Sequence, residues 1–588
     1  MMSSARQVSR WATPLFRTLC LLAAVDSTFA AVAITPPATP PSANANVVYS
    51  NFLGISLELS FINDYMGNTT DQIPAPFISY LSTLQKHASG KPVRLRLGGN
   101  SMDSSTYVPT QPDIIEFTDP NANSNDQPVN YGPQLFDVMK GVSSQVGGAQ
   151  YLIGLSLRVP NNTNIPLVAG DASKALGDEL DAYLLGNEPD LYTGHGQRPY
   201  LSNYTTQDYI GDYSVVFNSL KSTPQGDVLA QDKIAGPTIC CAWNLASVLQ
   251  SGWLDQYKEQ LKYITLQHYP QDTCSGHPHF GIEWYLVHSN TVGLAQWQQD
   301  GIQIAKQANK PVLMDEFNSI SCGGTDGISN VFGVSLWTTD YALQMAAVGY
   351  AGAYLHTRER GVTYNLFDPP AGPAGSAGAW TTNAPYYGML PVYEALESSS
   401  GSRVVDLNVK NGMYDATQVH AAYAIYDGVD STVRSLVVIN YKNASGTTSD
   451  YAIDPSFIPA TNSSITIRTL AAPSVAERTN IAWGGQTWAG VGDGNPVPAT
   501  FAGSVPDKTI ACAGGCTIQV PGPGLAVIFV GNNPANSANA TSNNGAHSSS
   551  TGASSPTHTT NSGTGRTASG IATVGLFSIL VAFLIHLQ

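Results

Sequence analysis

Eight short apolar runs, separated by stretches with helical spacing, constrain the fold of this chain more than any other feature of its sequence. The runs begin at Phe52, Val93, Tyr151, Asp181, Lys233, Tyr263, Pro311 and Gly352. Between them, residues 209–222, 297–308 and 336–349 carry apolar side chains at helical spacing. Strands that alternate with helices indicate βα units and a parallel sheet. Eight such units over residues 47–387 predict an α/β fold, a (β/α)8 barrel.

The sequence changes character after Tyr387 and predicts a second domain. Short runs such as VHAAYAIYD, TVRSLVVINYK and GLAVIFVG alternate apolar and polar residues between turns rich in Gly and Asn. This pattern predicts a C-terminal antiparallel β-sandwich over residues 388–531. Residues 47–49, just before the first barrel strand, could add an edge strand to it.

The N-terminal residues 1–30 predict a secretory signal peptide. Arginines precede or interrupt an apolar run at 15–25, and small residues follow through Ala30. The run is shorter than the ~20 apolar residues that a membrane span requires. We therefore expect an exported protein.

The C-terminal residues predict a lipid anchor. Residues 532–570 are almost all Ser, Thr, Asn, Gly and Ala, which is typical of a solvated stalk. The apolar tail 571–588 ends the sequence, and the small residues 561–563 lie one polar spacer upstream, as in a glycosylphosphatidylinositol (GPI) attachment signal whose tail is removed. A plain membrane helix is the alternative, but no basic segment follows the tail. We expect a secreted protein held at the cell surface by a GPI anchor.

Composition limits the partners. The net charge is −15 and only 12% of the residues are charged. A nucleic-acid binder needs a basic face to displace counterions from phosphates, so this class is not expected. We expect a glycan substrate, contact with a membrane only through the lipid anchor, and a monomer.

Seven cysteines are present, and Cys20 would leave with the signal. The six cysteines that remain are an even number, which in an exported protein implies disulfides. Cys512 and Cys516 flank a short loop and are expected to pair. Cys240, Cys241, Cys274 and Cys322 allow three pairings, and the sequence does not choose among them. The cysteines have no histidine partners at zinc spacing, so we predict neither a metal nor a cofactor. Sequons at Asn68, Asn161, Asn203, Asn443, Asn462 and Asn539 agree with glycosylation during export.

Two carboxylates are placed where a barrel enzyme carries out its chemistry. Active sites of these barrels lie at the carboxyl ends of the strands. Glu188 follows the fourth strand and Glu316 ends the seventh, so both are predicted to face the same mouth. A carboxylate pair of this kind can cleave a glycosidic bond, one as acid and one as nucleophile or base. A single glutamate at a strand end is more often a surface cap or an ion-pair partner, so the argument depends on the pair.

Three motifs carry a resemblance to a known family. GNEPD at 186–190, DEFNS at 315–319 and RLGGNS at 96–101 resemble retaining (β/α)8 glycosidases whose acid follows an asparagine. The runs SLELSF and RLRLGGNSMD, with the Gly-Gly after DEFNSISC, make the chain most similar to glycoside hydrolase family 79, the β-glucuronidase and heparanase-like family. The resemblance covers residues 47–531 and suggests a fungal-type, GPI-anchored member.

The resemblance implies catalytic roles for five residues. Glu188 would be the acid/base and Glu316 the nucleophile, with Arg96 keeping Glu316 ionised and Tyr269 hydrogen-bonded to it. Asn187 would hydrogen-bond the sugar 2-hydroxyl. In the retaining mechanism the two carboxyl groups lie ~5–5.5 Å apart.

Substrate contacts are expected from the surrounding loops. Gly323 and Gly324 could present backbone donors to the carboxylate of a glucuronide. Glu58 either binds a sugar hydroxyl or braces the loop that carries Asn100 and Ser101, both of which are also candidate substrate contacts. Seven more residues are candidates for substrate contact. The alternative role is a solvated face for Arg358 and Arg360, a wall of the site for His268 and His356, and the core for Trp243, Trp284 and Trp337.

The predicted activity is a retaining glycoside hydrolase that removes terminal β-linked glucuronic acid, or its 4-O-methyl form, from glycans. One alternative keeps both glutamates and changes the donor, giving a β-glucosidase or a cell-wall transglycosidase on neutral glycans. Another is a non-catalytic, glycan-binding surface protein.

Overall fold

The computed structural model describes residues 31–530 except 275, 374–375, 410–418 and 459–463. The predicted signal peptide, stalk and hydrophobic tail, and the sequons at Asn462 and Asn539, lie outside the described residues.

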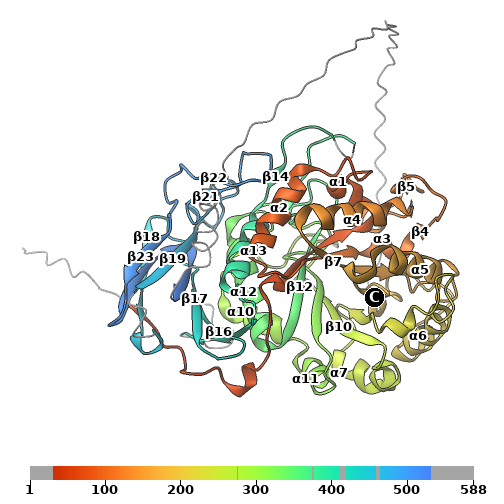
Figure 1. The fold of residues 1–588 in the computed structure, drawn as a ribbon, viewed down its shortest axis with the longest axis horizontal. Helices are drawn as coiled ribbons and strands as arrows, with labels where there is room; N and C mark the ends of the chain where they lie inside the picture. The colour runs from red at the N-terminus through yellow and green to blue at the C-terminus, as the bar shows by residue number, and fades with distance from the viewer. Residues whose placement is uncertain (1–30, 275, 374–375, 410–418, 459–463, 531–588) are drawn as a thin grey trace, which may run out of the picture. The chain divides into compact units, whose positions relative to one another are not determined.

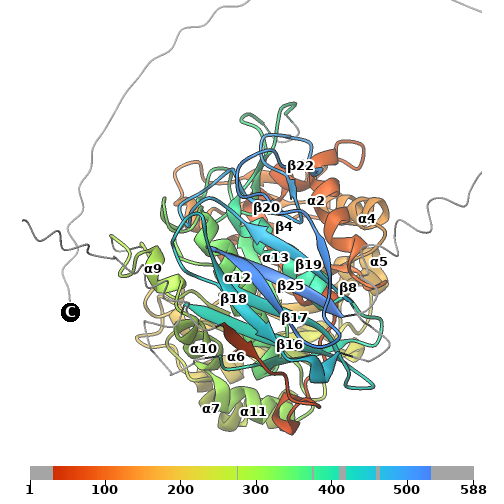
Figure 2. The same ribbon diagram turned by 90° about the vertical axis from the view of Figure 1, so that its left-hand side faces the viewer.

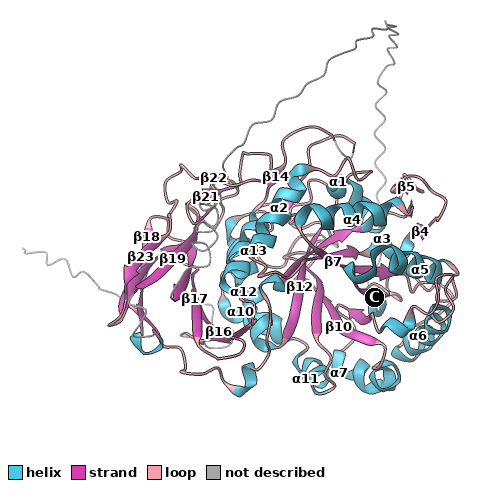
Figure 3. Ribbon diagram, viewed as in Figure 1, coloured by secondary structure: helices cyan, strands magenta, loops and turns pink. Residues whose placement is uncertain are grey.

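Eight parallel strands close into a barrel, and one strand lies in each of the eight apolar runs, so the predicted fold class is confirmed (Figures 1 and 3). The strands are β2 (Leu53–Glu58), β3 (Val93–Gly98), β7 (Ala149–Leu155), β8 (Leu180–Leu185), β9 (Ile234–Ile239), β10 (Leu261–His268), β11 (Val312–Phe317) and β12 (Tyr350–Thr357). β12 pairs with β2 in parallel and completes the ring. A small interior core includes Leu152, Leu184, Leu313 and Tyr354.

Helices surround the barrel, as Figure 3 shows in cyan. They include α2 (Ala75–Lys86), α4 (Gln134–Val146), α5 (Asn164–Leu176), α6 (Thr206–Leu220), α10 (His288–Gln296), α11 (Gln299–Gln307), α12 (Phe332–Val348) and α13 (Ala384–Ala395). The three helices expected from spacing are α6, α11 and α12. α6 begins with a capping box between Thr205 and Asp208, which satisfies amide groups that the first turn leaves unpaired.

The C-terminal domain is a sandwich of a nine-stranded and a three-stranded sheet, and Figure 2 views it from the side away from the barrel. The larger sheet contains β15 (Ser402–Asp406), β16 (His420–Asp427), β17 (Val433–Asn440), β19 (Ser464–Ala471), β20 (Ala482–Trp483), β21 (Gln486–Thr487), β22 (Val497–Pro498), β23 (Lys508–Ala511) and β25 (Gly524–Val530). The smaller contains β1 (Val32–Ile34), β18 (Thr447–Ile453) and β24 (Cys516–Gly522).

The segment at 47–49 contributes only a single bridge, between Val48 and Ser402 at the start of β15. The N-terminal strand that joins the sandwich is instead β1, which pairs in parallel with β18. Three residues give too short a pattern for the sequence to have revealed it.

The two domains share one core. The apolar cluster of the barrel and its helices continues into the inner face of the nine-stranded sheet, through residues such as Val437, Leu470 and Val527. A second cluster fills the space between the two sheets and includes Ile453 and Ile528. α12 lies between barrel and sheet and is buried almost throughout. The predicted boundary after Tyr387 falls inside α13, because this helix continues to cover the sheet up to Ala395.

The described part of the chain contains two disulfides. Cys512 and Cys516 pair as expected, and Cys274 pairs with Cys322. The second bridge joins the loop after β10 to the loop after β11, two loops of the barrel mouth. Cys240 and Cys241 remain thiols, so the even cysteine count misled in their case.

Candidate active site

A sharp turn after β8 presents Glu188 to the barrel mouth. Glu188 has a φ of 47° and a ψ of 54°, in the left-handed region that non-glycine residues seldom adopt. Its N–H donates to the carbonyl of Thr238 at 3.1 Å, which ties the turn to the end of β9. Such backbone strain persists only where the surrounding structure enforces it, and it concentrates at functional sites.

The end of β11 turns two consecutive acidic residues toward the barrel interior. The pairing of β10 with β11 shifts register between Leu266 and Gln267, so that Asp315 is skipped and Gln267 pairs with Glu316. An extra residue in one strand re-aims the side chains that follow it. Regular alternation would have pointed Asp315 and Glu316 to opposite faces. The bulge therefore explains how both reach one cluster.

Two donors hold Glu316. Arg96 Nη1 donates to its Oε2 at 2.6 Å, and the Tyr269 hydroxyl donates to its Oε1 at 2.9 Å. Glu316 is 8% exposed and Arg96 1% exposed, so the ion pair is shielded from water. Both carboxylate oxygens have a fixed partner, and the group is oriented before any substrate arrives.

Arg96 links several elements of the site. Leu95 and Leu97 point into the core outside the barrel, so alternation in β3 sends Arg96 inward. Its Nη1 also donates to Ser56 at 3.0 Å, and its Nη2 donates to Asn187 Oδ1 at 2.9 Å. A Cβ on Gly98 would lie 2.6 Å from Arg96 Nε, so only glycine leaves room for the guanidinium.

The amide of Asn187 is fixed by a chain of side chains. Its Oδ1 also accepts from Gln267 Nε2 at 3.0 Å, and its Nδ2 donates to Asn100 Oδ1 at 2.9 Å. Asn100 thus positions Asn187 directly. Gln267 was missed by the sequence argument, which read the end of β10 from His268 onward and so began one residue after Gln267.

The environment of Glu188 favours its protonated form. Burial raises its pKa well above the usual range, and the nearby charge of Glu316 raises it further. The two carboxyl groups are therefore within electrostatic reach of each other. The expected separation of ~5–5.5 Å remains a prediction. Burial also raises the pKa of Asp315 to about 7, with Arg96 opposing this effect.

Glu58 and Ser101 contact each other. Glu58 accepts hydrogen bonds from both the backbone N–H of Ser101, at 2.9 Å, and its hydroxyl. Its other oxygen lies 3.3 Å from His356 Nε2. Burial opposes the ionised form, but His356 and Arg358 lower the pKa of Glu58 to about 2. These contacts favour the brace over the sugar contact for Glu58, and they occupy Ser101, which is 1% exposed.

The loop after β11 is held on three sides. The Cys274–Cys322 disulfide anchors it, Ser321 bridges to Asp272, and the Thr363 hydroxyl donates to the Gly323 carbonyl at 2.8 Å. Within the described residues, the N–H groups of Gly323 and Gly324 have no protein acceptor. They can therefore serve a ligand.

Tyr364 is a further residue that the sequence argument missed. Its ring lies 6.3 Å from that of Tyr269 and 6.1 Å from that of His356. Burial raises its pKa, and the charges of Glu316 and Glu58 add to the effect. The residue comes from the loop after β12, seven residues beyond the strand, where no motif marks it.

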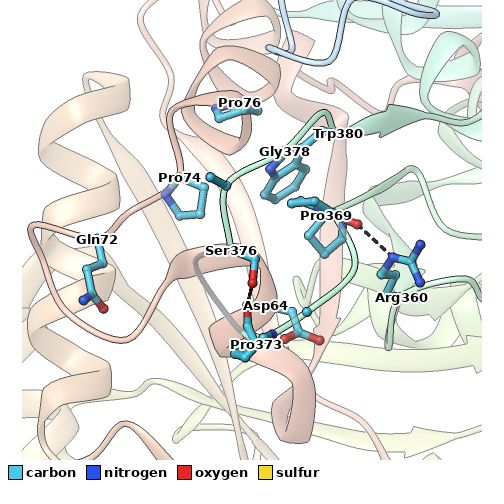
Figure 4. Close-up of a pocket in the computed structure, with 13 residues that line it drawn as sticks. Asp64, Gln72, Pro74, Pro76, Arg360, Pro369, Pro373, Ser376, Gly378 and Trp380 are labelled. Carbon is cyan, nitrogen blue, oxygen red and sulfur yellow. Dashed lines mark hydrogen bonds between the residues drawn. The ribbon is translucent and has the colours of Figure 1, made fainter. Parts of the chain in front are cut away.

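The two candidate arginines are engaged elsewhere. Arg358 is buried, and its guanidinium contacts Glu359, the Asn125 side chain and the Ser124 carbonyl. Arg360 lines a cavity of about 210 Å³ (Figure 4) and donates to the Pro369 carbonyl at 3.1 Å. None of the catalytic candidates lines this cavity, whose walls are mainly proline, glycine and Trp380.

The remaining candidates pack against neighbouring aromatic rings or lie in the core. His268 stacks on Trp297 with a centroid distance of 4.2 Å, and burial lowers its pKa to about 4. Trp337 is fully buried in α12, whereas Trp243 and Trp284 are half-buried and stack on Tyr204 and Phe280. Among the described residues, no group of three His, Cys, Asp or Glu side chains is arranged to hold a metal ion.

Known proteins resemble this chain in sequence and in fold. Residues 422–527 match the family described as the glycosyl hydrolase family 79 C-terminal beta domain. A β-glucuronidase of Aspergillus niger is 26% identical over 485 residues, covering 77% of this chain and 85% of that protein. A β-glucuronidase of Neurospora crassa is 26% identical over 469 residues, covering 74% and 79%.

Among solved structures, a 4-O-α-L-rhamnosyl-β-D-glucuronidase from Fusarium oxysporum superimposes with a TM-score of 0.68. It is 20% identical and covers 85% of this chain and all of that one, which shows a shared fold. The barrel, its relatives and its β domain define the chain as a glycoside hydrolase. The matched β domain and the two relatives support glycoside hydrolase family 79.

Proposed function

We propose that the chain is a retaining β-glucuronidase that removes terminal β-linked glucuronic acid, or its 4-O-methyl form, from glycans. The observation that carries the proposal is a carboxylate held by two donors near a second, buried carboxyl group whose surroundings favour its protonated form. Glu316 is held by Arg96 and Tyr269, and Glu188, within its electrostatic reach, has a raised pKa. The names of the Aspergillus and Neurospora relatives support glucuronic acid as the donor.

In the first step, Glu316 attacks the anomeric carbon while Glu188 gives its proton to the leaving oxygen. A glycosyl ester forms on Glu316, and the glycosidic bond breaks. Glu188 can supply a proton at neutral pH because burial and the Glu316 charge keep it protonated.

In the second step, Glu188 removes a proton from water, which attacks the ester and frees the sugar. Once Glu316 is esterified, its negative charge is gone, so the largest charge that raises the pKa of Glu188 disappears. Glu188 then ionises more readily and can act as a base. One pair of residues therefore serves both steps.

The sugar carboxylate is proposed to bind at the loop after β11. The N–H groups of Gly323 and Gly324 are oriented by a disulfide-anchored loop and can donate to an anion. Asn187, fixed by Arg96, Gln267 and Asn100, retains one Nδ2 hydrogen for the 2-hydroxyl.

We also propose that the enzyme is exported, carries N-linked glycans and is held at the cell surface by a GPI anchor as a monomer. The support is the sequence alone, from the two termini and the sequons. Within the described residues, no helix is both long and apolar enough to cross a membrane.

Matched nitrophenyl substrates test the donor. The enzyme should hydrolyse the β-glucuronide with a kcat/KM more than about 100-fold above that for the β-glucoside. Nuclear magnetic resonance should show the β-anomer of glucuronic acid as the first product. Equal rates on the two substrates would contradict the donor, and an α-anomer formed first would contradict retention.

Two variants test the residue roles. Glu188→Ala should lose activity and regain it with azide, which needs no base and yields the β-glucuronyl azide. Glu316→Ala should not be rescued with retention, because no ester can form. The reverse pattern would exchange the two roles.

A further inference from the structure

A fully buried aspartate lies beside the proposed nucleophile. Asp315 is 0% exposed and comes directly before Glu316 in β11. Leu313 belongs to the small core inside the barrel and Met314 to the core outside it, so alternation sends Asp315 inward. The catalytic scheme above gives this carboxyl group no role.

Asp315 shares its two donors with Asn187. Gln267 Nε2 donates to Asp315 Oδ2 at 3.2 Å and to Asn187 Oδ1 at 3.0 Å. Arg96 Nη2 donates to the same Asn187 oxygen at 2.9 Å and lies 3.7 Å from Asp315 Oδ2. Both nitrogens that orient the Asn187 amide therefore also face Asp315.

One cation serves two buried carboxyl groups. Arg96 donates to Glu316 at 2.6 Å, whereas its distance of 3.7 Å from Asp315 is too long for a hydrogen bond. The groups around Asp315 on other strands are Arg96 from β3, the neutral amide of Gln267 from β10 and the phenol of Tyr354 from β12. A second anion buried beside a single cation is costly, so two carboxyl groups in such a site seldom both ionise.

Two unpaired oxygens point to a proton on this aspartate. Within the described residues, Asp315 Oδ1 and Gln267 Oε1 are buried and have no hydrogen-bond partner. They are the remaining oxygens of two groups that already touch through Oδ2 and Nε2. Two unprotonated acceptors cannot satisfy each other, whereas a carboxylic acid brings the O–H donor that this pair lacks. Because a buried acceptor without a donor is costly, the geometry favours the neutral acid.

We propose that Asp315 is a positioning residue that works as a neutral carboxylic acid. It supports the Asn187 amide through Gln267. It also leaves the charge of Arg96 to Glu316. The inference rests on the roles proposed above for Glu316 and Asn187, and it adds an uncharged carboxyl group to the site. Loss of the proton would place a second anion beside Arg96 and draw both donors away from Asn187, so the ionised form should be inactive.

Alkaline pH should remove this proton. Burial raises the pKa of Asp315 to about 7, and the charge of Glu316 adds to this effect, whereas Arg96 and the bond from Gln267 oppose it. Asp315 is therefore neutral below about pH 7 and ionised above it. We expect kcat/KM of the wild type to fall as pH rises through this range.

Asp315→Asn tests the neutral acid, because asparagine keeps an acceptor and a donor but cannot ionise. The variant should retain at least about a third of the wild-type kcat/KM at about pH 6, and the ratio of variant to wild type should rise about tenfold by about pH 8. Asp181→Asn is the control, since Asp181 is also buried but lies at the start of β8, where it pairs with Lys262 at 2.6 Å. Its ratio should stay constant. A constant ratio for Asp315→Asn, or a loss of more than about 100-fold at about pH 6, would overturn the neutral acid.

Asp315→Ala tests the path through Asn187. On nitrophenyl β-glucuronide, kcat should fall about tenfold with little change in KM, because the contact with the 2-hydroxyl tightens in the transition state. On the matching 2-deoxy substrate, which lacks this hydroxyl, the loss should be less than about threefold. Asp315→Asn should show no such difference. Equal losses of Asp315→Ala on the two substrates would show that Asp315 does not act through Asn187.

Infrared difference spectra separate this inference from the proposed function, since they need no turnover. Between about pH 6 and about pH 8, Glu188→Gln should lose a carboxylic-acid C=O signal that Glu188→Gln/Asp315→Asn does not lose. Identical spectra for the two proteins would overturn the neutral acid even in an active enzyme. Absence of turnover on every glycoside would instead refute the proposed function, and the spectra would still decide the state of Asp315.

Discussion

Arg96 shows how much of the site depends on a single buried side chain. It joins Glu316, Asn187 and Ser56 by hydrogen bonds, and it lies 3.7 Å from Asp315. A planar guanidinium can make these bonds in several fixed directions at once, which a lysine ammonium cannot. Glu316 and Asn187 are therefore oriented by the same group.

Tyr269 provides a simpler test of how Glu316 is held. Tyr269→Phe removes the 2.9 Å hydrogen bond to Oε1 and leaves the ring in place. A hydrogen bond to a charged group contributes about 1.5–3 kcal/mol, so we expect kcat to fall about 10- to 100-fold. Tyr364→Phe is the matched control, since the Tyr364 ring is close by, and its loss should be smaller. An unchanged kcat in Tyr269→Phe would contradict the role of the bond.

Gly99 is a position where only glycine fits. Its φ is +83°, and a Cβ there would collide with the Glu58 carboxylate. Gly90 has a similar φ of +77° with nothing within 4 Å of the added carbon. Gly99→Ala should therefore cost activity and stability well beyond the ~1–2 kcal/mol of backbone strain in Gly90→Ala. Equal unfolding midpoints for the two variants would show that the collision has no effect.

The sequence predicted part of this residue cluster. Glu188, Glu316, Arg96, Asn187, Asn100 and Tyr269 were all named, and the structure brings them together. Gln267 and Tyr364 were not named as site residues. Their contacts depend on a bulge and on a long loop, and neither of these leaves a local pattern in the sequence.

The loops at the barrel mouth form the next level of organisation. Asp190 ties the β8 and β9 ends together, and the Cys274–Cys322 disulfide ties the β10 and β11 ends. Each bridge joins loops from neighbouring strands. Glu188 and Glu316 thus lie on separately braced halves of the mouth.

Asp190→Asn should loosen one of these braces. The variant loses the charge that strengthens four N–H bonds, at a cost of about 1–3 kcal/mol. We expect amide hydrogens of residues 240–243 to exchange about tenfold faster or more, with a lower kcat. Asp227→Asn is the control, because Asp227 accepts a single exposed amide, that of Ala230. Unchanged exchange at 240–243 would show that the loop is held by other contacts.

At the level of elements, apolar runs were sufficient to predict the barrel. All eight strands lie in the predicted runs, because strands buried on both faces are nearly continuous apolar segments. Loop pairing could not be predicted in this way. β9, β10 and β11 are consecutive neighbours in the barrel, so strand order alone places the Cys274 loop beside the loop of Cys240 and Cys241 as well as beside the loop of Cys322.

A buried polar cluster joins the two domains across the molecule. His288 of α10 lies 3.0 Å from both oxygens of Asp340 in α12 and 3.4 Å from Asp406 at the end of β15. Tyr423 and Tyr441 of the β domain donate to the same Asp340 at 2.6 and 2.7 Å. The cluster satisfies every charge that it buries, so it connects the barrel helices to the sheet.

Because of this cluster, the free energy of unfolding should fall as pH rises into the alkaline range. Although burial opposes its charge, Asp340 and then Asp406 raise the pKa of His288 to about 10. Because the pKa of His288 is higher in the folded chain than in the unfolded chain, its charge contributes fully to stability below about pH 6.5, the unfolded pKa. This contribution is lost as pH rises to about 10, the folded pKa. The wild type should therefore lose stability between pH 7 and pH 10.

His288→Gln should lose most of this pH dependence. It should also unfold more easily at pH 7, by about 3–5 kcal/mol, as expected when a buried ion pair loses one partner. Thermal melts at pH 7 and pH 10 measure both effects, with the exposed His279→Gln as the control. Parallel slopes in the two variants would contradict the charge of His288.

The whole molecule was predicted less completely than its parts. No sequence pattern indicated the Asp340 cluster or the core shared by barrel and sheet, because both depend on side chains far apart along the chain. Alternating strands after Tyr387 revealed a β domain but not which face meets α12 and α13. The packing of whole elements decides which face of the sheet meets the helices, and a local sequence pattern does not show it.

The position of β25 in the large sheet has a consequence for synthesis. β25 is the last strand of the described chain, yet it lies between β17 and β19 in the sheet interior. Until β25 has emerged from the ribosome, the edges of β17 and β19 that it later covers have no partner strand. Such unpaired edges can pair with another chain, so the large sheet is exposed to aggregation until β25 is in place.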